Sequence, residues 1–175
     1  MKPSGQIHIY TGNGKGKTTA ALGCALRAMG AGMRVYLGQF MKKGHFSEVK
    51  ALKVFQGQIT IEQFGRTGFY TKQEKDRDKQ TQYAVKGLKK AGRAMLSGKY
   101  DVVILDEINI AVHFSLLREL EVLSLIERKP QKVELILTGR YAPPSLIACA
   151  HLVSEIQEVK HYYKKGVAAR KGIEK

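Results

Sequence analysis

The segment from residue 7 to residue 19, IHIYTGNGKGKTT, limits the possible folds of this chain more than any other feature. An apolar, β-branched run leads into three glycines spaced two residues apart, and Lys17 then opens a helical pattern. A glycine-rich turn between a strand and a helix presents backbone N–H groups to an anion, and the helix N-terminus adds partial positive charge. The segment therefore predicts an α/β fold with a phosphate-binding loop after its first strand.

The rest of the chain continues this alternation. Short apolar runs predict strands at 6–10, 33–40, 59–64, 101–107, 132–139 and 151–160, and helical patterns occupy 17–32, 47–55, 73–97, 116–129 and 143–150. Such alternation is typical of a mainly parallel sheet with helices on both faces. A length of 175 residues with 43% hydrophobic side chains predicts one domain spanning 1–175, which ends in a basic segment at about 160–175.

In sheets of this kind, ligands bind outside the carboxyl ends of the strands. The loops expected there are 11–17, 40–46, 65–72, 106–114 and 139–143. Functional side chains should therefore come from these five loops.

The phosphate loop departs from the usual pattern G-x-x-x-x-G-K-[ST], because Thr11 stands where the first glycine is expected. Glycines let the backbone approach phosphate oxygens closely. Lys17 can reach a phosphate as a point charge, and Thr18 offers a hydroxyl to Mg²⁺. The predicted nucleotide-binding residues of the loop are Gly12, Asn13, Gly14, Lys15, Gly16, Lys17, Thr18 and Thr19.

A second element supports this interpretation. The run VVILDE resembles a Walker B strand, a buried strand that ends in acids, here Asp106 and Glu107. Mg²⁺ prefers oxygen ligands and retains several waters, so these carboxylates and Thr18 form the predicted metal site. The two elements together predict binding of ATP, or a similar triphosphate, with Mg²⁺.

A phosphate loop does not by itself name a reaction. Glu107 can orient a water molecule, and Arg66 and Arg140 lie in loops on the correct edge of the sheet. The net charge of +15 suggests a RecA-like ATPase that binds nucleic acid. A small-molecule kinase is the other alternative, and both stay open on these residues.

Much of the positive charge falls on the predicted helix at 73–97. Its basic residues Lys86, Lys89, Lys90 and Arg93 share one side, opposite an apolar side formed by Ala84, Leu88, Ala91 and Met95. This is the pattern of an amphipathic helix with a solvated polar face. No zinc finger or aromatic RNA-binding motif accompanies it, which makes a nucleic-acid partner less favoured.

The location of the protein follows from weaker signals. No apolar run is long enough for a membrane-spanning helix, and the N-terminus lacks a signal-peptide pattern. Cys24 and Cys149 lie in apolar surroundings without metal-ligand spacing. These features predict a cytoplasmic protein with buried, reduced thiols and no membrane partner.

Six segments, taken in order along the chain, resemble one known family. They are YTGNGKGKTTAALG, QFMKKG, GFYT, VVILDE, LTGRYAP and LVSEIQEVKHYYKKGVAARKGIE. Together they are similar to the P-loop type of ATP:corrinoid adenosyltransferases, and the similarity covers nearly the whole chain. In this family the threonine at position 11 is the usual form of the loop.

The resemblance implies a RecA-like P-loop fold, a homodimer and a specific reaction. The family transfers the 5′-deoxyadenosyl group of ATP to the Co(I) of a reduced corrinoid, and inorganic triphosphate leaves. ATP lies in the loop in the reverse of the usual direction. Lys17 would neutralise the triphosphate as the catalytic residue, Thr18 with Asp106 or Glu107 would bind Mg²⁺, and Arg140 would contact the nucleotide.

The resemblance also indicates where the corrinoid binds. Phe69 and Tyr70 are the candidates for an apolar wall that excludes water from cobalt. Lys42, Lys43 and His45 follow the second strand, near the expected corrinoid entrance. An electron-donor protein that reduces cobalt is the expected macromolecular partner.

Overall fold

The computed structural model describes residues 4–66 and 74–174. The strands are β1 (Ile7–Thr11), β2 (Val35–Phe40), β3 (Ile59–Phe64), β4 (Val102–Asp106), β5 (Glu134–Thr138) and β6 (Leu152–Glu155). They form one sheet in the order β3-β2-β4-β5-β1-β6, and every neighbouring pair is parallel. The predicted parallel sheet is therefore confirmed, and all carboxyl ends of its strands lie along one edge.

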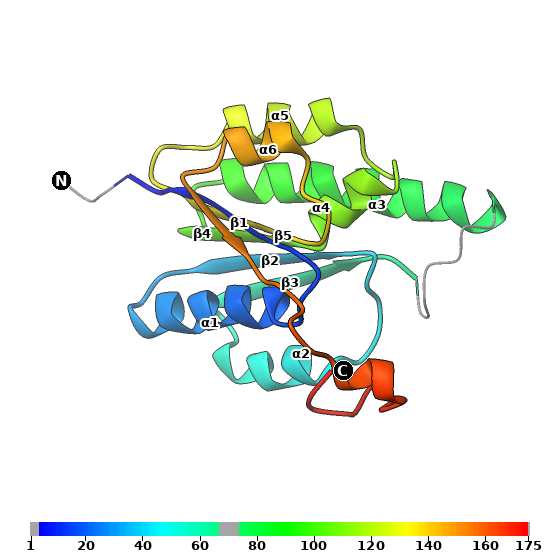
Figure 1. Ribbon diagram of the computed structural model, residues 1–175. Coiled ribbons are helices and arrows are strands. Elements are labelled where there is room, and N and C mark those ends of the chain that lie inside the picture. The colour runs from blue at the N-terminus through cyan, green and yellow to red at the C-terminus, as the bar shows by residue number, and fades with distance from the viewer. Residues whose placement is uncertain (1–3, 67–73, 175) are drawn as a thin grey trace.

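Helices cover both faces of the sheet, as predicted (Figure 1). Their bounds are α1 (Lys17–Gly30), α2 (Ser47–Ala51), η1 (Leu52–Phe55), α3 (Glu74–Leu96), α4 (Ile108–His113), α5 (Glu119–Glu127), α6 (Pro144–Ala148) and η2 (Tyr162–Lys165). Helices α1 and α2 lie below the sheet in Figure 1, and α3 to α6 lie above it. This layered arrangement is that of a RecA-like P-loop fold.

The core consists of two apolar layers, one on each face. Below the sheet, the small side chains of Ala21 and Ala25 and the longer Met29 pack against it from α1 at helical spacing. Above the sheet, the layer is larger because four helices contribute to it. Strands β2, β4 and most of β5 are buried along their length, which explains their continuous apolar sequences.

Helix α3 has the predicted amphipathic character. Ala84, Ala91 and Met95 are buried, while Lys86 and Arg93 are exposed. The basic residues of α3 differ in their surroundings, because Lys90, at the edge of the basic face, forms an ion pair with Glu62 of β3.

Two predictions of local structure are wrong in detail. The loop predicted at 106–114 contains α4, whose sequence INIAVH continues the apolar run of β4 and gives no capping signal. The last strand is 152–155 instead of 151–160, and all four of its residues are exposed because β6 is an edge strand. Within the described residues, no helix combines the length and the apolar character needed to cross a bilayer.

Candidate nucleotide-binding site

The phosphate loop joins β1 to α1 at the carboxyl edge of the sheet. Gly12 and Gly16 have φ values of 92° and 126°, which favour glycine and turn the chain into the helix. Lys17 is only 7% exposed, and its Nζ donates to the carbonyl oxygens of Gly12 and Gly14, both at 2.7 Å. The ammonium therefore lies inside the loop, where phosphate oxygens can replace the two carbonyls.

The electrostatic surroundings of Lys17 fit an anion site. Burial lowers the pKa of its ammonium, and the carboxylate of Glu107 acts in the opposite direction. A desolvated ammonium gains more from a bound phosphate than an exposed one does, because water screens the interaction less.

Asp106 lies at the end of β4 and is fully buried. Its Oδ1 accepts hydrogen bonds from the hydroxyls of Thr18 at 2.8 Å and Thr138 at 2.7 Å. Its Oδ2 accepts from Lys42 Nζ at 2.7 Å and from Gln39 Nε2 at 3.4 Å. The network fixes the carboxylate beside the first turn of α1.

The donor set at this point fits Mg²⁺. Because the Thr18 hydroxyl donates its proton to Asp106, its lone pairs stay available to a cation. Among the described residues, no three His, Cys, Asp or Glu side chains converge into a metal cluster. A Mg²⁺ ion here would therefore rely on Thr18, the acids Asp106 and Glu107, phosphate oxygens and water, a combination that Mg²⁺ commonly uses.

Glu107, the third predicted metal residue, begins the turn into α4. Its φ of 63° is in the left-handed region, and its backbone N–H donates to Thr138 Oγ1 at 3.0 Å. Burial raises the pKa of its carboxyl, and the neighbouring Asp106 raises it further. A nearby cation would favour its charged form.

Thr11 replaces the usual glycine without strain, because it is the last residue of β1. Its Oγ1 accepts a hydrogen bond from the Ala142 backbone N–H at 3.3 Å, and its carbonyl accepts from Ile156 at 2.9 Å. The side chain thus ties the phosphate loop to the loop after β5.

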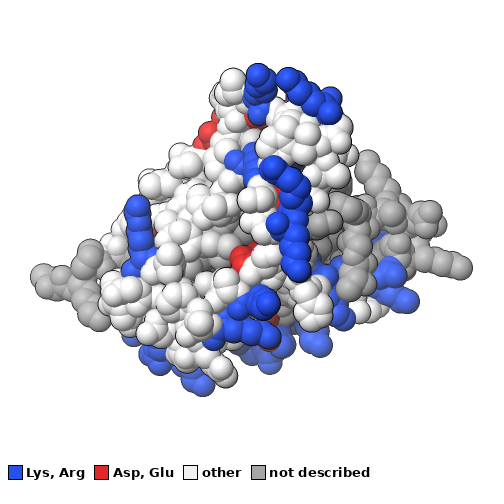
Figure 2. All heavy atoms as spheres, turned by 90° about the horizontal axis from the view of Figure 1, so that it is seen from below, with Lys and Arg blue, Asp and Glu red and all other residues white. Residues whose placement is uncertain are grey.

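The C-terminal segment forms a second side of the site that the sequence did not predict. The Gly14 N–H donates to the Ile156 carbonyl at 2.7 Å. Lys15 Nζ donates to Tyr162 Oη at 3.1 Å and to Glu174 Oε1 at 3.0 Å. The segment lies on the α1 side of the sheet in Figure 1, and Figure 2 shows that Lys and Arg predominate over Asp and Glu on that face.

The other predicted residues divide into three groups. Arg140 is exposed, and its charge acts on both Lys17 and Glu107, so it lies at the edge of the site. Phe69 and Tyr70 lie outside the described residues. The ammonium of Lys42 contacts Asp106 at the predicted metal site, and its expected place near the corrinoid entrance stays a prediction.

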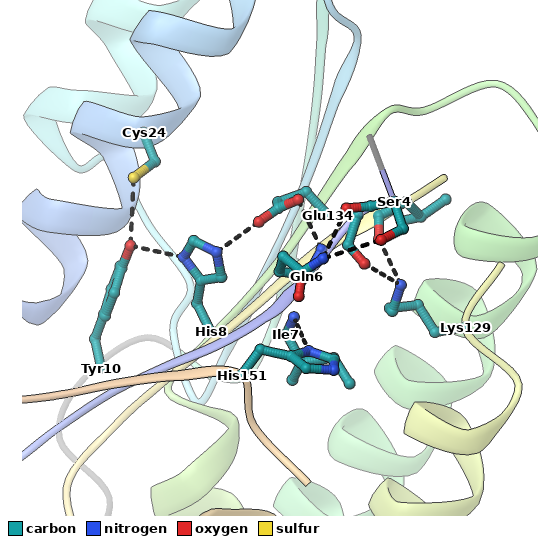
Figure 3. Close-up of polar contacts among 11 residues, drawn as sticks. Ser4, Gln6, Ile7, His8, Tyr10, Cys24, Lys129, Glu134 and His151 are labelled. Atoms are coloured by element: carbon teal, nitrogen blue, oxygen red, sulfur yellow. Dashed lines mark hydrogen bonds and ion pairs between the residues drawn. The ribbon is translucent and has the colours of Figure 1, made fainter. Parts of the chain in front are cut away.

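A separate polar cluster joins β1, β5 and α1, as Figure 3 shows. His8 Nε2 lies 2.5 Å from Glu134 Oε1, and His8 Nδ1 lies 3.3 Å from Tyr10 Oη. Tyr10 Oη in turn contacts Cys24 Sγ at 3.3 Å. Cys24 and Cys149 are free, as predicted, but both are only half-buried.

The fold and the loop define a P-loop nucleotide-binding protein. Residues 3–174 match the family described as ATP:corrinoid adenosyltransferase BtuR/CobO/CobP. The chain is 34% identical to a corrinoid adenosyltransferase of Pseudomonas aeruginosa, over 97% of this chain and 83% of that relative. It is 36% identical to the corrinoid adenosyltransferases of Escherichia coli K12 and Salmonella typhimurium, over 97% of this chain and 85% of each relative.

The chain belongs to the family of ATP:corrinoid adenosyltransferases, which transfer the adenosyl group of ATP to a reduced corrinoid. The resemblance seen in the sequence is therefore confirmed, and so are the substrates ATP and corrinoid that the family implies.

Proposed function

We propose that this chain transfers the 5′-deoxyadenosyl group of ATP to the Co(I) of a reduced corrinoid and releases inorganic triphosphate. The observation that carries the proposal is the family match over 3–174, which includes the phosphate loop, the acidic end of β4 and the C-terminal segment. The position of Lys17 inside the loop supports it.

The reaction requires little acid–base chemistry from the protein. The electron pair of Co(I) forms a bond to C5′, the C5′–O bond breaks, and its electron pair leaves with the triphosphate. The protein must align the two substrates and stabilise the negative charge of the leaving group. We assign that stabilisation to the N–H groups of the loop, the N-terminus of α1 and the ammonium of Lys17.

We propose that Thr18, Asp106 and Glu107 hold Mg²⁺ with the triphosphate. Bound there, the ion would neutralise charge on the phosphate oxygens. Thr18 and Asp106 are supported by their mutual hydrogen bond at 2.8 Å, and Glu107 by its position next to Asp106. Arg140 is proposed as a nucleotide contact because its charge acts at the same edge.

The remaining expectations are also proposals. We propose that residues 1–175 act as one domain, that two copies form a homodimer, and that an electron-donor protein reduces the cobalt. We propose that the protein is cytoplasmic, because its substrates would be ATP and a Co(I) corrinoid. We further propose that ATP lies reversed in the loop, so that C5′ faces the corrinoid.

The decisive experiment mixes the protein with ATP, Mg²⁺ and a chemically reduced corrinoid in the absence of oxygen. We expect the absorption spectrum of an adenosyl–cobalt bond and one triphosphate for each corrinoid converted. Formation of ADP with a phosphorylated small molecule would support a kinase instead. ADP and phosphate formed in response to DNA would support a nucleic-acid-dependent ATPase.

A further inference from the structure

Lys42 places a positive charge beside the two oxygens that a metal ion would use. Its Nζ lies 2.7 Å from Asp106 Oδ2 and 3.4 Å from Thr18 Oγ1. The Asp106 side chain has no exposed surface, whereas that of Lys42 is 20% exposed. The lysine therefore reaches the buried carboxylate from a partly exposed position.

The backbone is shaped to hold Lys42 in this position. Met41, the preceding residue, has a φ of 55°, an uncommon conformation for a residue with a side chain. A Cβ on Gly65 would lie 2.6 Å from the backbone nitrogen of Lys42, so this close approach requires glycine there. The Phe46 ring also lies 5.8 Å from Lys42 Nζ. Strain and close packing of this kind indicate a position that the fold specifies.

A second connection joins the same loop to Asp106. Gln39 Nε2 donates to Asp106, Gln63 Nε2 donates to the side-chain Oε1 of Gln39 at 3.0 Å, and the Gly44 N–H donates to Gln63 Oε1 at 3.1 Å. The segment 41–46 thus contacts the carboxylate through the ammonium of Lys42 and through two glutamines.

Burial favours a cation next to the carboxylate of Asp106. A buried carboxylate without a counter-charge is costly, and its hydroxyl partners supply no charge. The ammonium supplies that charge in the protein alone. A Mg²⁺ ion bound to Thr18 and Asp106 would lie at the same oxygens, so the two cations exclude each other.

We propose that Lys42 is an internal substitute for Mg²⁺, which holds Asp106 and Thr18 in place before the nucleotide binds and is displaced when Mg²⁺ enters with ATP. The inference rests on the proposed metal site. It makes Lys42 a positioning residue for Asp106 and Thr18. It also implies that Mg²⁺ without ATP competes poorly with the ammonium.

The test measures binding of Mn²⁺, a spectroscopic probe for Mg²⁺, to the nucleotide-free protein by electron paramagnetic resonance. Lys42→Met removes the charge but keeps the length of the side chain. We expect this variant to bind Mn²⁺ at least about tenfold more tightly than the unaltered protein, because Asp106 has lost its competing cation. Lys43→Met is the matched control, since Lys43 is exposed and next in sequence, and it should leave Mn²⁺ affinity unchanged.

Thermal unfolding gives a second readout that needs no corrinoid. In chelator, Lys42→Met should unfold at a lower temperature than the unaltered protein, and Mg²⁺ should restore most of the loss. If Lys42→Met does not fold, Lys42→Gln takes its place, because it keeps a hydrogen-bond donor but carries no charge. We expect the same results for it in both measurements. Equal Mn²⁺ affinity in the unaltered protein and the folded charge-free variant would overturn the proposal. Neither measurement depends on adenosyl transfer, so failure of the proposed reaction would be seen separately.

Discussion

The phosphate loop has an inner side, which faces Asp106 at the end of β4, and an outer side, which faces the C-terminal segment. Lysines on both sides contact acidic or carbonyl groups, but their surroundings differ. On the inner side, Lys17 and Lys42 are largely buried beside the fully buried Asp106. On the outer side, Lys15 is 40% exposed and contacts Glu174 of the C-terminal segment. An ion pair between a lysine and a carboxylate is therefore largely buried on the inner side and partly exposed to water on the outer side.

This contrast indicates which side of the loop binds an anionic ligand. The outer cluster satisfies its charges within the chain, and water screens them. On the inner side, the Lys17 ammonium donates its hydrogen bonds to two neutral carbonyl oxygens, which phosphate oxygens can replace. An anion that enters the loop can therefore gain strong, weakly screened interactions on the inner side only.

The largest expected effect comes from Lys17→Met, compared with Lys15→Met on the outer side. We expect adenosyl transfer to fall by about 100-fold or more in the first variant, since loss of one preorganised donor to a developing charge costs about that much. The second should lose less than about tenfold. The measurement is the rate of adenosyl–cobalt formation at saturating ATP, with circular dichroism to check folding. Equal losses in the two variants would contradict the distinction between the sides.

Asp106→Asn should have the largest effect on stability. The variant leaves the Lys42 ammonium without its counter-charge, so the free energy of unfolding should fall by about 3–5 kcal/mol. Chemical denaturation measures the change. The double variant with Lys42→Met should recover part of the loss, because the unpaired ammonium is removed. A double variant no more stable than Asp106→Asn alone would show that the ion pair is not the cause.

Gly14→Ala tests the contact between the phosphate loop and the C-terminal segment. A Cβ at Gly14 would lie 2.7 Å from the carbonyl oxygens of Ile156 and Gln157, so the C-terminal segment must shift. We expect a loss of about 1–3 kcal/mol in the free energy of unfolding. Gly23→Ala is the control, because a Cβ added at Gly23 would meet no described atom within 4 Å beyond its chain neighbours and its own helix backbone. Gly23 also lies inside α1, where alanine is favoured over glycine by up to about 1 kcal/mol. Unchanged stability in Gly14→Ala would show that the segment is only loosely attached.

The smallest effect is expected for Glu174→Gln. A side-chain hydrogen bond from Arg170, and to a smaller extent one from Tyr162, holds the pKa of the Glu174 carboxyl well below its ordinary value of 4.5. The ionised form stabilises the segment fully above pH 4.5, and the stabilisation is lost as the pH falls through the lowered pKa. Affinity for ATP should change less than about threefold.

The pH dependence of this outer cluster can be followed at one amide. The Arg170 N–H donates to Glu174 Oε2 at 2.7 Å, so its proton chemical shift reports the carboxylate. In the unaltered protein the shift should stay constant from pH 8 to about pH 5 and change only in stronger acid. A change centred near pH 4.5 would contradict the lowered pKa, and Glu174→Gln should show no such titration.

The parallel sheet, the phosphate loop and the family could all be predicted from the amino-acid sequence. Continuous apolar runs such as VVILD predict buried parallel strands, because both faces of such a strand are covered. The pattern around Lys17 and the acids at the end of β4 are local, and each follows a predicted strand. Local patterns of this kind are readable because strands and helices have different periods. Helix α4 was missed because its apolar sequence extends that of β4 without a break.

Which charged side chains contact one another could not be predicted from the sequence and follows from the three-dimensional fold. Lys42 and Asp106 are 64 residues apart in sequence, and Lys15 and Glu174 are 159 apart, so no local pattern relates them. The sequence places Lys42 only in the loop after β2, and the order of β2 next to β4, together with the turn at Met41, brings its ammonium to the predicted metal site. The strand order of a sheet fixes such pairs, and burial then sets their strength, because the exclusion of water strengthens Coulomb interactions between charges.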